Sequence, residues 1–61
     1  MTLKRILVYF DGAEKNAKII MSTVEKVLAK YPKAFLVDAT DNQLAILKRI
    51  GFEFEGEIGF Q

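Results

Sequence analysis

The sequence predicts a single small α/β domain over residues 1–61, with strands and helices in the order β-α-β-α-β. Three patterns indicate this fold: a short apolar run near the start, a long segment with helical spacing, and a final segment of strict alternation. Hydrophobic residues make up 51% of the chain and charged residues 28%, which is typical of a folded globular protein. We therefore expect a three-stranded sheet with two helices.

Residues 3–10 form the first predicted strand, because residues 6–10 are continuously apolar and too few for a helix. Such an unbroken run is typical of a strand that is covered on both faces. Residues 13–31 form the first predicted helix, with Asp11 and Glu14 spaced as a capping box and Pro32 as its stop. Its apolar positions follow helical spacing and are Ala17, Ile20, Met21, Val24, Val27, Leu28 and Tyr31.

The second half of the chain continues the pattern, with clear end signals for its helix. Residues 34–37 form a short strand, and Thr40 with Gln43 has the spacing of a capping box for a helix that runs to Ile50. Gly51 suits the left-handed residue that ends many helices. Residues 52–60 form the last strand. Its apolar face holds Phe52, Phe54, Ile58 and Phe60, and its acidic face holds Glu53, Glu55 and Glu57.

The order of the strands stays open at this point. A strand-helix-strand passage predicts a right-handed parallel crossover between the strands at 3–10 and 34–37. If the strands lie in sequence order, both helices cover one face, and Leu7, Tyr9 and Leu36 on the other face need a cover. If the first strand is central, the helices lie on opposite faces and no partner is needed.

Composition excludes several classes of function. The net charge of +1 argues against a nucleic-acid binder or a polybasic membrane binder, and the chain has no cysteine and no histidine. Disulfide frameworks, zinc fingers, cysteine nucleophiles and Ser-His-Asp triads are therefore excluded. No apolar run approaches the ~18 residues of a membrane span, and the first residues lack a signal-peptide cleavage site. We expect a cytoplasmic chain with no nucleic-acid, membrane or metal partner.

The size of the chain favours self-association. A domain of about 60 residues buries only about 60% of the surface that its unfolded chain exposes, so a disulfide, a metal or a partner often stabilises it. We expect a homodimer formed through a sheet edge or a sheet face, and the alternative is a monomer with efficient helix-on-sheet packing. Most basic residues lie in 1–33 and most acidic residues in 34–61, which suits either charge pairing between copies or a solvated surface.

Two groups of carboxylates are candidates for chemistry. The row of Glu53, Glu55 and Glu57 suits the binding of a hard cation such as calcium or magnesium. It is equally typical of a solvated strand whose charges prevent pairing with another strand. Asp38 and Asp41 flank a strand-to-helix turn, which is where open α/β sheets place ligands. Capping and turn formation explain these two aspartates equally well.

The turn between the first strand and the first helix is the candidate phosphate site. A helix N-terminus offers free backbone N–H groups, and nearby lysines add positive charge. The candidate cofactor-binding residues are Gly12, Ala13, Lys15, Asn16 and Ala17. The carboxylates of Asp11 and Glu14 compete for the same N–H groups and repel an anion.

Residues 38–57 resemble the late segment of the GNAT acyltransferase family. That segment has an Asn with an Ala three residues later, then a helix, and then a Gly-Phe pair that opens a strand with Glu and Gly. Asn42, Ala45, Gly51 and Phe52 occupy these positions here. The resemblance implies that the chain corresponds to the second half of a GNAT domain, with residues 12–17 in the place of the acetyl-CoA pyrophosphate loop.

The departures from that family imply a remnant without enzyme activity. The pyrophosphate loop of the family reads Arg/Gln-x-x-Gly-x-Gly/Ala, and Ala17 is the position that matches it. Residues 47–49 stand where the family often has a tyrosine as general acid, and the substrate-binding front half has no counterpart. The family also places its last strand between the strands that match 34–37 and 52–60, so the resemblance implies a gap that a partner's strand fills.

A second, fainter likeness is to the propeptide-type inhibitors of subtilisin. These inhibitors have a ferredoxin-like sheet and a Val-Asp-Ala-like stretch before the second helix, which corresponds to residues 37–39 here. Their fold needs a fourth strand, which the patterns above do not reveal. They insert a C-terminal tail into the protease, and residues 56–61 would be that tail.

Together these observations predict a small non-catalytic, GNAT-like protein–protein interaction module that self-associates. The first alternative is an acetyl-CoA-binding acyltransferase remnant, with acetyl-CoA at residues 12–17. The second alternative is a propeptide-like protease inhibitor.

Overall fold

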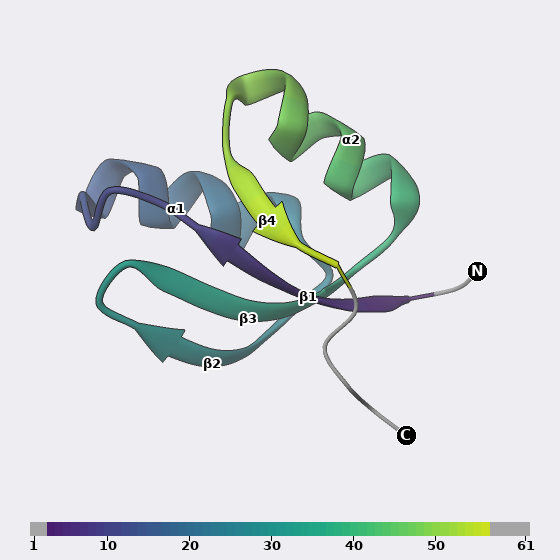
Figure 1. Ribbon diagram of the computed structural model, residues 1–61, viewed down its shortest axis with the longest axis horizontal. Helices are drawn as coiled ribbons and strands as arrows, with labels where there is room; N and C mark the ends of the chain where they lie inside the picture. Colours follow the sequence, from purple (N-terminus) through teal and green to yellow (C-terminus); the bar gives the residue numbers. More distant parts are fainter. Residues whose placement is uncertain (1–2, 57–61) are drawn as a thin grey trace.

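The fold has one more strand than the sequence patterns predict. The computed structural model describes residues 3–56, and in this range the elements are β1 (Lys4–Tyr9), α1 (Glu14–Thr23), β2 (Lys26–Tyr31), β3 (Ala34–Ala39), α2 (Asp41–Ile50) and β4 (Glu53–Glu55). The strands form one antiparallel sheet in the order β2-β3-β1-β4 (Figure 1). The α/β class and the two helices are confirmed, whereas the three-stranded sheet and the β-α-β-α-β order are wrong.

The missed strand, β2, lies inside the segment 13–31 that the spacing assigned to a helix. Helix α1 ends at Thr23, where the hydroxyl groups of Ser22 and Thr23 donate to the Ile19 carbonyl at 3.1 and 2.7 Å. Such side-chain bonds compete with the backbone and favour the end of a helix. Val24 is extended, with φ −85° and ψ 163°, and the chain then enters the sheet.

Residues 26–31 form a strand although their apolar positions fit helical spacing, because a bulged strand can carry the same spacing as a helix. The pairing of β2 with β3 is irregular between Val27 and Ala29, which breaks the alternation that marks an ordinary strand. Valine and tyrosine in this segment favour a strand by residue type. The packing of β2 against β3 therefore determines that this segment is a strand, although its apolar spacing favours a helix.

The predicted parallel crossover from β1 to β3 is also wrong. Pro32 and Lys33 form the turn of a β2–β3 hairpin, so β3 runs antiparallel to both β2 and β1. Strand β2 is therefore parallel to β1, with β3 between them, and β3 is likewise parallel to β4 across β1. Each helix thus connects two parallel strands that are separated by a third strand, which is the split β-α-β arrangement of a ferredoxin-like sheet.

Both helices cover the same face of the sheet, and the core lies between the two layers (Figure 1). Strand β1 is central, yet the described elements cover only one of its faces: Ile6 and Val8 are buried, while Leu7 is half-buried and Tyr9 exposed. The prediction that this strand is covered on both faces is therefore wrong. The buried core comprises Ile6, Val8, Ile20, Val24, Phe35, Val37, Ala39, Leu44 and Leu47.

The predicted ends of α2 are confirmed. The Thr40 hydroxyl oxygen accepts from the Gln43 N–H at 3.2 Å, and the Gln43 side-chain oxygen accepts from the Thr40 N–H at 2.9 Å. Gly51 follows the helix with φ 120°, and its N–H donates to the Leu47 carbonyl at 3.1 Å. The capping box predicted for α1 is wrong, because the N-cap there is Ala13 and has no side-chain bond.

The last predicted strand, 52–60, is confirmed for residues 53–55, whereas Phe52 and Gly56 are described and lie outside β4. Phe52 and Phe54 pack against the core, and Glu53 and Glu55 are exposed on the opposite face. The predicted positions of Glu57, Ile58 and Phe60 lie outside the described residues. Within residues 3–56, neither helix has the length and the apolar character that crossing a membrane requires.

Candidate functional site

The face of the sheet opposite the helices is the main candidate for binding, and we call it the open face. Strand alternation and the pairing register assign its residues, since paired residues point to the same side of a sheet. They form three rows across the strands: Glu53, Tyr9, Ala34 and Tyr31; then Glu55, Leu7, Leu36 and Ala29; then Arg5, Asp38 and Lys26. Of the described elements, no helix covers these rows.

The centre of the open face is apolar and hollow. Leu7 pairs with Leu36 in the register of β1 and β3, and these two line a shallow pocket of about 330 Å³ with Tyr31 and Ala34. Tyr31 is 52% exposed and Tyr9 is 38% exposed. Scattered apolar side chains on a surface are ordinary, but a contiguous apolar group that is rimmed by polar residues is typical of an interaction site.

One edge of the open face is acidic. Glu53 and Glu55 of β4 are exposed and lie in register with Tyr9 and Leu7 of β1. A hydrogen bond from the Tyr9 hydroxyl to the Glu55 carboxylate raises the pKa of Tyr9 above its ordinary 10.0, with partial desolvation and the Glu55 charge acting in the same direction. Among the described residues, no three acidic side chains come together as metal ligands, and Glu57 lies outside this range.

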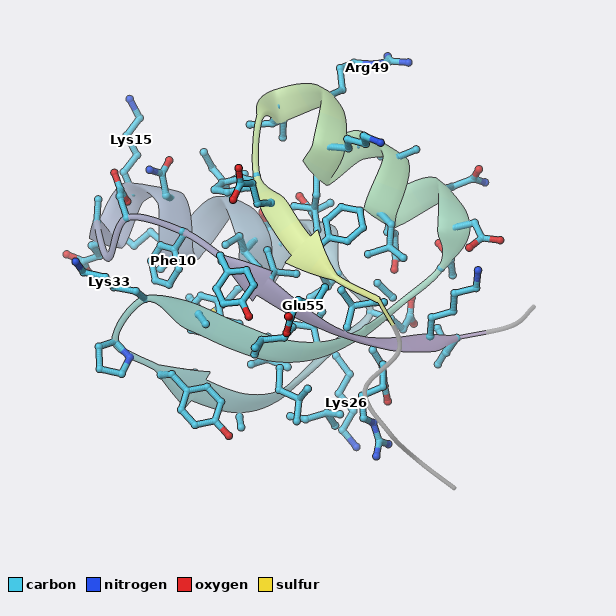
Figure 2. All side chains as sticks on the ribbon, in the orientation of Figure 1. Phe10, Lys15, Lys26, Lys33, Arg49 and Glu55 are labelled. Atoms are coloured by element: carbon cyan, nitrogen blue, oxygen red, sulfur yellow. The ribbon has the colours of Figure 1, made fainter. Side chains whose placement is uncertain are left out.

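The opposite edge of the open face is basic. Lys26 of β2 pairs in register with Asp38 of β3, and the Arg5 Nε lies 3.2 Å from the Asp38 Oδ1. Lys26 and Glu55 therefore lie on the two edge strands of the same sheet, at opposite sides of the apolar centre (Figure 2). The open face thus carries a gradient of charge from β2 to β4.

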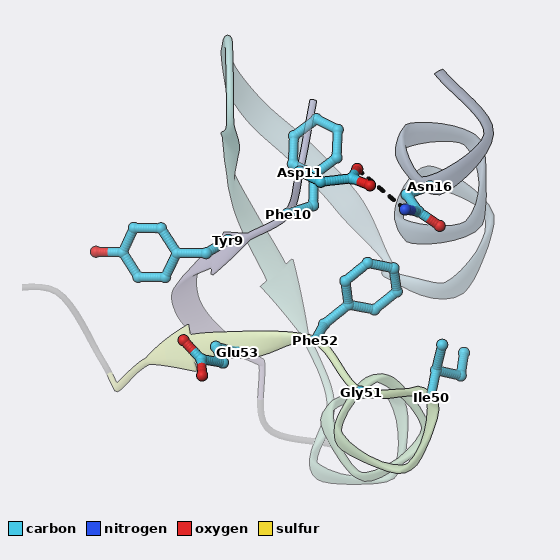
Figure 3. Close-up of a pocket in the computed structure, with 8 residues that line it drawn as sticks. All are labelled: Tyr9, Phe10, Asp11, Asn16, Ile50, Gly51, Phe52 and Glu53. Carbon is cyan, nitrogen blue, oxygen red and sulfur yellow. Dashed lines mark hydrogen bonds between the residues drawn. The ribbon is translucent and has the colours of Figure 1, made fainter. Parts of the chain in front are cut away.

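A second candidate is an open pocket of about 430 Å³ at the end of the molecule where β1 meets α1 and α2 meets β4. Its lining residues are Tyr9, Phe10, Asp11, Asn16, Ile50, Gly51, Phe52 and Glu53. Tyr9 and Glu53 point away from Phe10 and Phe52, toward the open face (Figure 3). The two carboxylates of this pocket therefore do not converge on one point, and the pocket has no arrangement of an acid and a base.

Asp11 holds the chain at the start of α1. Its Oδ1 accepts from the Ala13 N–H at 2.9 Å and from the Asn16 Nδ2 at 3.0 Å (Figure 3). The Asn16 bond, followed by the Ala13 bond, lowers the pKa of Asp11 below its ordinary 3.8, so this carboxylate is ionised at neutral pH. A negative charge therefore stands beside the helix N-terminus where the candidate phosphate would bind.

The predicted cofactor-binding residues lie together at that helix start but form no phosphate-wrapping loop. Gly12 and Ala13 lie in the connection from β1, and Lys15, Asn16 and Ala17 lie in the first turn of α1. The Ala17 N–H already donates to the Ala13 carbonyl at 3.0 Å, and Ala17 packs against the core. Gly12 has φ 90°, and a Cβ there would lie 3.3 Å from the Pro32 carbonyl oxygen. Binding of acetyl-CoA at these residues stays a prediction.

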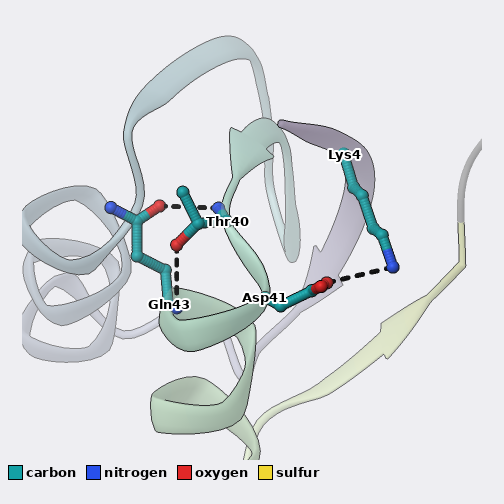
Figure 4. Close-up of polar contacts among 4 residues, drawn as sticks. All are labelled: Lys4, Thr40, Asp41 and Gln43. Atoms are coloured by element: carbon teal, nitrogen blue, oxygen red, sulfur yellow. Dashed lines mark hydrogen bonds and ion pairs between the residues drawn. The ribbon is translucent and has the colours of Figure 1, made fainter. Parts of the chain in front are cut away.

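The two candidate aspartates at the β3–α2 turn each belong to a separate ion pair. Asp38 pairs with Arg5 on the open face, and the Asp41 Oδ1 lies 3.0 Å from the Lys4 Nζ (Figure 4). Asp41 is also the first residue of α2, directly after the Thr40 cap, where a negative charge stabilises the helix. These contacts give both carboxylates a structural role.

The sequence patterns missed the β2 part of the open face. Lys26, Ala29 and Tyr31 fall in the segment 13–31 that the spacing predicts as a helix, so the sequence does not predict their side chains beside Leu36 and Asp38. The signal that marks the hairpin is the Pro32-Lys33 pair between two runs of strand-forming residues. No family model, curated protein or solved structure matches this chain. The resemblances to the acetyltransferases and to the propeptide inhibitors therefore stay predictions.

Proposed function

We propose that this chain is a small non-catalytic protein-interaction module that binds its partner through the open face. The observation that carries the proposal is the apolar hollow of Leu7, Tyr31, Ala34 and Leu36 on the side of the sheet that the helices leave uncovered. An apolar centre with a polar rim, and with aromatic residues in it, is the usual composition of a protein interface.

The side chains available for chemistry favour binding over catalysis. The chain has no cysteine or histidine, and the aspartates nearest to a turn or a pocket are held by Lys4, Arg5, Ala13 and Asn16. The GNAT resemblance of residues 38–57 supports the same conclusion, because residues 47–49 do not offer the tyrosine that the family uses as general acid.

Site-specific photo-cross-linking tests this proposal, and the chain offers closely matched positions for it. A benzophenone amino acid replaces Tyr9 or Tyr31 on the open face, and Met21 or Ile50 on the helices serve as controls. Tyr9 and Met21 are both 38% exposed, while Tyr31 and Ile50 are 52% and 51% exposed. Each pair therefore differs in the face that it samples and not in the exposure of the side chain.

We expect cross-linked protein adducts from Tyr9 and Tyr31 in cells that express the chain, and at most traces from Met21 and Ile50. The reason is that a docked partner covers one face of the sheet only. Equal yields from the two faces, or no adduct from either tyrosine, would refute the proposal. Circular dichroism of each purified variant shows whether the chain still folds.

A propeptide-like protease inhibitor is the second candidate, and the strand β2 favours it. The order β-α-β-β-α-β with four antiparallel strands is the ferredoxin-like arrangement to which that resemblance points. The tail that would enter the protease begins at Gly56, and residues 57–61 lie outside the described residues. Inhibition of subtilisin that is lost on deletion of residues 58–61, with an unchanged far-UV spectrum, would support this candidate. A full-length chain that does not slow subtilisin at high micromolar concentration would exclude it.

A further inference from the structure

We infer that the partner on the open face is a second copy of this chain, packed face to face about a two-fold axis that is parallel to the strands. The axis passes between β1 and β3, so that β1 of each copy lies over β3 of the other, and β4 over β2. This inference rests on the proposed function, because it names the occupant of the same face. Three features support this inference. They are the charges at the two edges of the open face, the sizes of its central side chains, and the protection of the outer edge of β2 against pairing with another strand.

The charges of the edges select the direction of the axis. Two sheets can face each other with the two-fold axis along the strands or across them. An axis across the strands puts β4 over β4, so that Glu53 and Glu55 meet their own copies and repel. An axis along the strands puts Glu53 of one copy over Tyr31 of the other and Glu55 over Ala29, with Lys26 in the next row of β2. Complementary charge thus favours the second arrangement.

The side chains along the axis are also self-complementary. Because Leu7, Tyr9 and Arg5 pair in register with Leu36, Ala34 and Asp38, the rotation puts each member of a pair over its partner in the other copy. Leucine then meets leucine, and the large Tyr9 meets the small Ala34. Arg5 and Asp38, already 3.2 Å apart within one copy, meet the opposite charge of the second copy as well. Large against small and positive against negative is what close packing of two identical faces needs.

The outer edge of β2 is built against the competing arrangement, in which two sheets join edge to edge. Lys26, Lys30 and Tyr31 on this strand are exposed, the strand has an irregularity between Val27 and Ala29, and Pro32 follows it directly. Lysines, bulges and proline are the features that keep an edge strand from pairing with another chain. We therefore expect association through the open face rather than through the edge of β2.

Charge reversal in sedimentation velocity tests both the partner and the axis. We expect the purified wild-type chain to dimerise in a roughly micromolar range, as small interfaces do. Glu55→Lys alone and Lys26→Glu alone should each weaken the dimer about tenfold, because each homodimer then has two pairs of like charges in neighbouring rows of the interface. An equimolar mixture of the two variants should dimerise like the wild type, since both pairs in the mixed dimer again have opposite charges. Lys48→Glu, an exposed reversal on α2, should leave the dimer unchanged.

The other outcomes overturn the inference and stay distinct from failure of the proposed function. A wild-type chain that stays monomeric up to millimolar concentration overturns the second copy as partner, even if Tyr31 cross-links to another protein. A dimer that Glu55→Lys and Lys26→Glu leave unchanged overturns the open face as its interface. Recovery when Glu55→Lys is mixed with wild type, rather than with Lys26→Glu, overturns the axis along the strands, because it requires β4 to lie over β4. The proposed function itself fails if the open-face tyrosines form no cross-link to any protein, or cross-link no more than Met21 and Ile50 do.

Discussion

Helix α2 provides a sharp test of the fold, because two neighbouring aliphatic residues on it have opposite environments. Leu47 is 0% exposed in the core, whereas Ile46 is 49% exposed on the outer side of the helix. Truncation of each to alanine removes aliphatic carbon atoms at adjacent positions of one helix. The two variants therefore differ in burial and very little in helix propensity.

The structure predicts a large difference in the free energy of unfolding between Leu47→Ala and Ile46→Ala. Truncation of a fully buried leucine costs about 2–5 kcal/mol, while a surface substitution usually costs about 0.5 kcal/mol or less. A chain of this length has a total stability of roughly 3–9 kcal/mol. Leu47→Ala should therefore remove a large part of the stability and lower Tm by about 10 °C or more, and Ile46→Ala should change it little.

Urea unfolding followed by far-UV circular dichroism measures both free energies of unfolding. If Leu47→Ala is unfolded in water, Leu47→Met keeps the comparison measurable, because a swap of similar volume usually costs less than about 1.5 kcal/mol. A larger loss for Ile46→Ala than for Leu47→Ala would refute the orientation of α2 on the sheet. Equal losses would refute it as well.

Further predictions concern the helix ends and the ionised groups. Thr40→Ala should cost about 1–2 kcal/mol in urea unfolding, because it removes the reciprocal cap of α2, and equal stability would contradict that role. Gly51→Ala should cost about 1 kcal/mol or more, because φ is 120° there although no atom stands in the way of a Cβ. Asp11 has a lowered pKa, so its contribution to stability is present above its unfolded pKa near 3.8 and is lost as the pH falls through the folded pKa. Asp11→Asn should therefore flatten the loss of stability between neutral and strongly acidic pH, and an unchanged pH profile would contradict this. Tyr9 has a raised pKa, so its contribution is present below pH 10 and is lost at higher pH; Glu55→Gln should move the Tyr9 titration, read by phenolate absorbance, back toward 10.0.

The sequence predicted those parts of the fold that local chemistry determines. Thr40 and Gln43 must lie three residues apart to bond each other's backbone, and Gly51 takes a positive φ at little cost, so α2 could be located from residue types alone. The alternation of Phe52 and Phe54 with the glutamates likewise located β4 and its two faces.

The remaining parts of the fold depend on contacts between segments that are distant in the sequence. Strand β2 pairs with β3 through an irregular register, and this pairing overrides the helical spacing of Val24, Val27 and Tyr31. Without β2, the residue patterns do not give the direction of β3. They also do not give the face of the sheet that the helices cover. The open face was therefore foreseen only in part, as Leu7, Tyr9 and Leu36, and its basic edge was not foreseen.

The most direct test of the account is a dilution series of methyl NMR spectra of the wild-type chain, from millimolar to micromolar concentration. The account predicts shifts of the Leu7 and Leu36 methyl signals on dilution, because these side chains leave an interface, with no change for Ile46 and Ile50 on the outer side of α2. Shifts at Ile46 and Ile50 without shifts at the two leucines would contradict it, as would spectra that do not change with concentration.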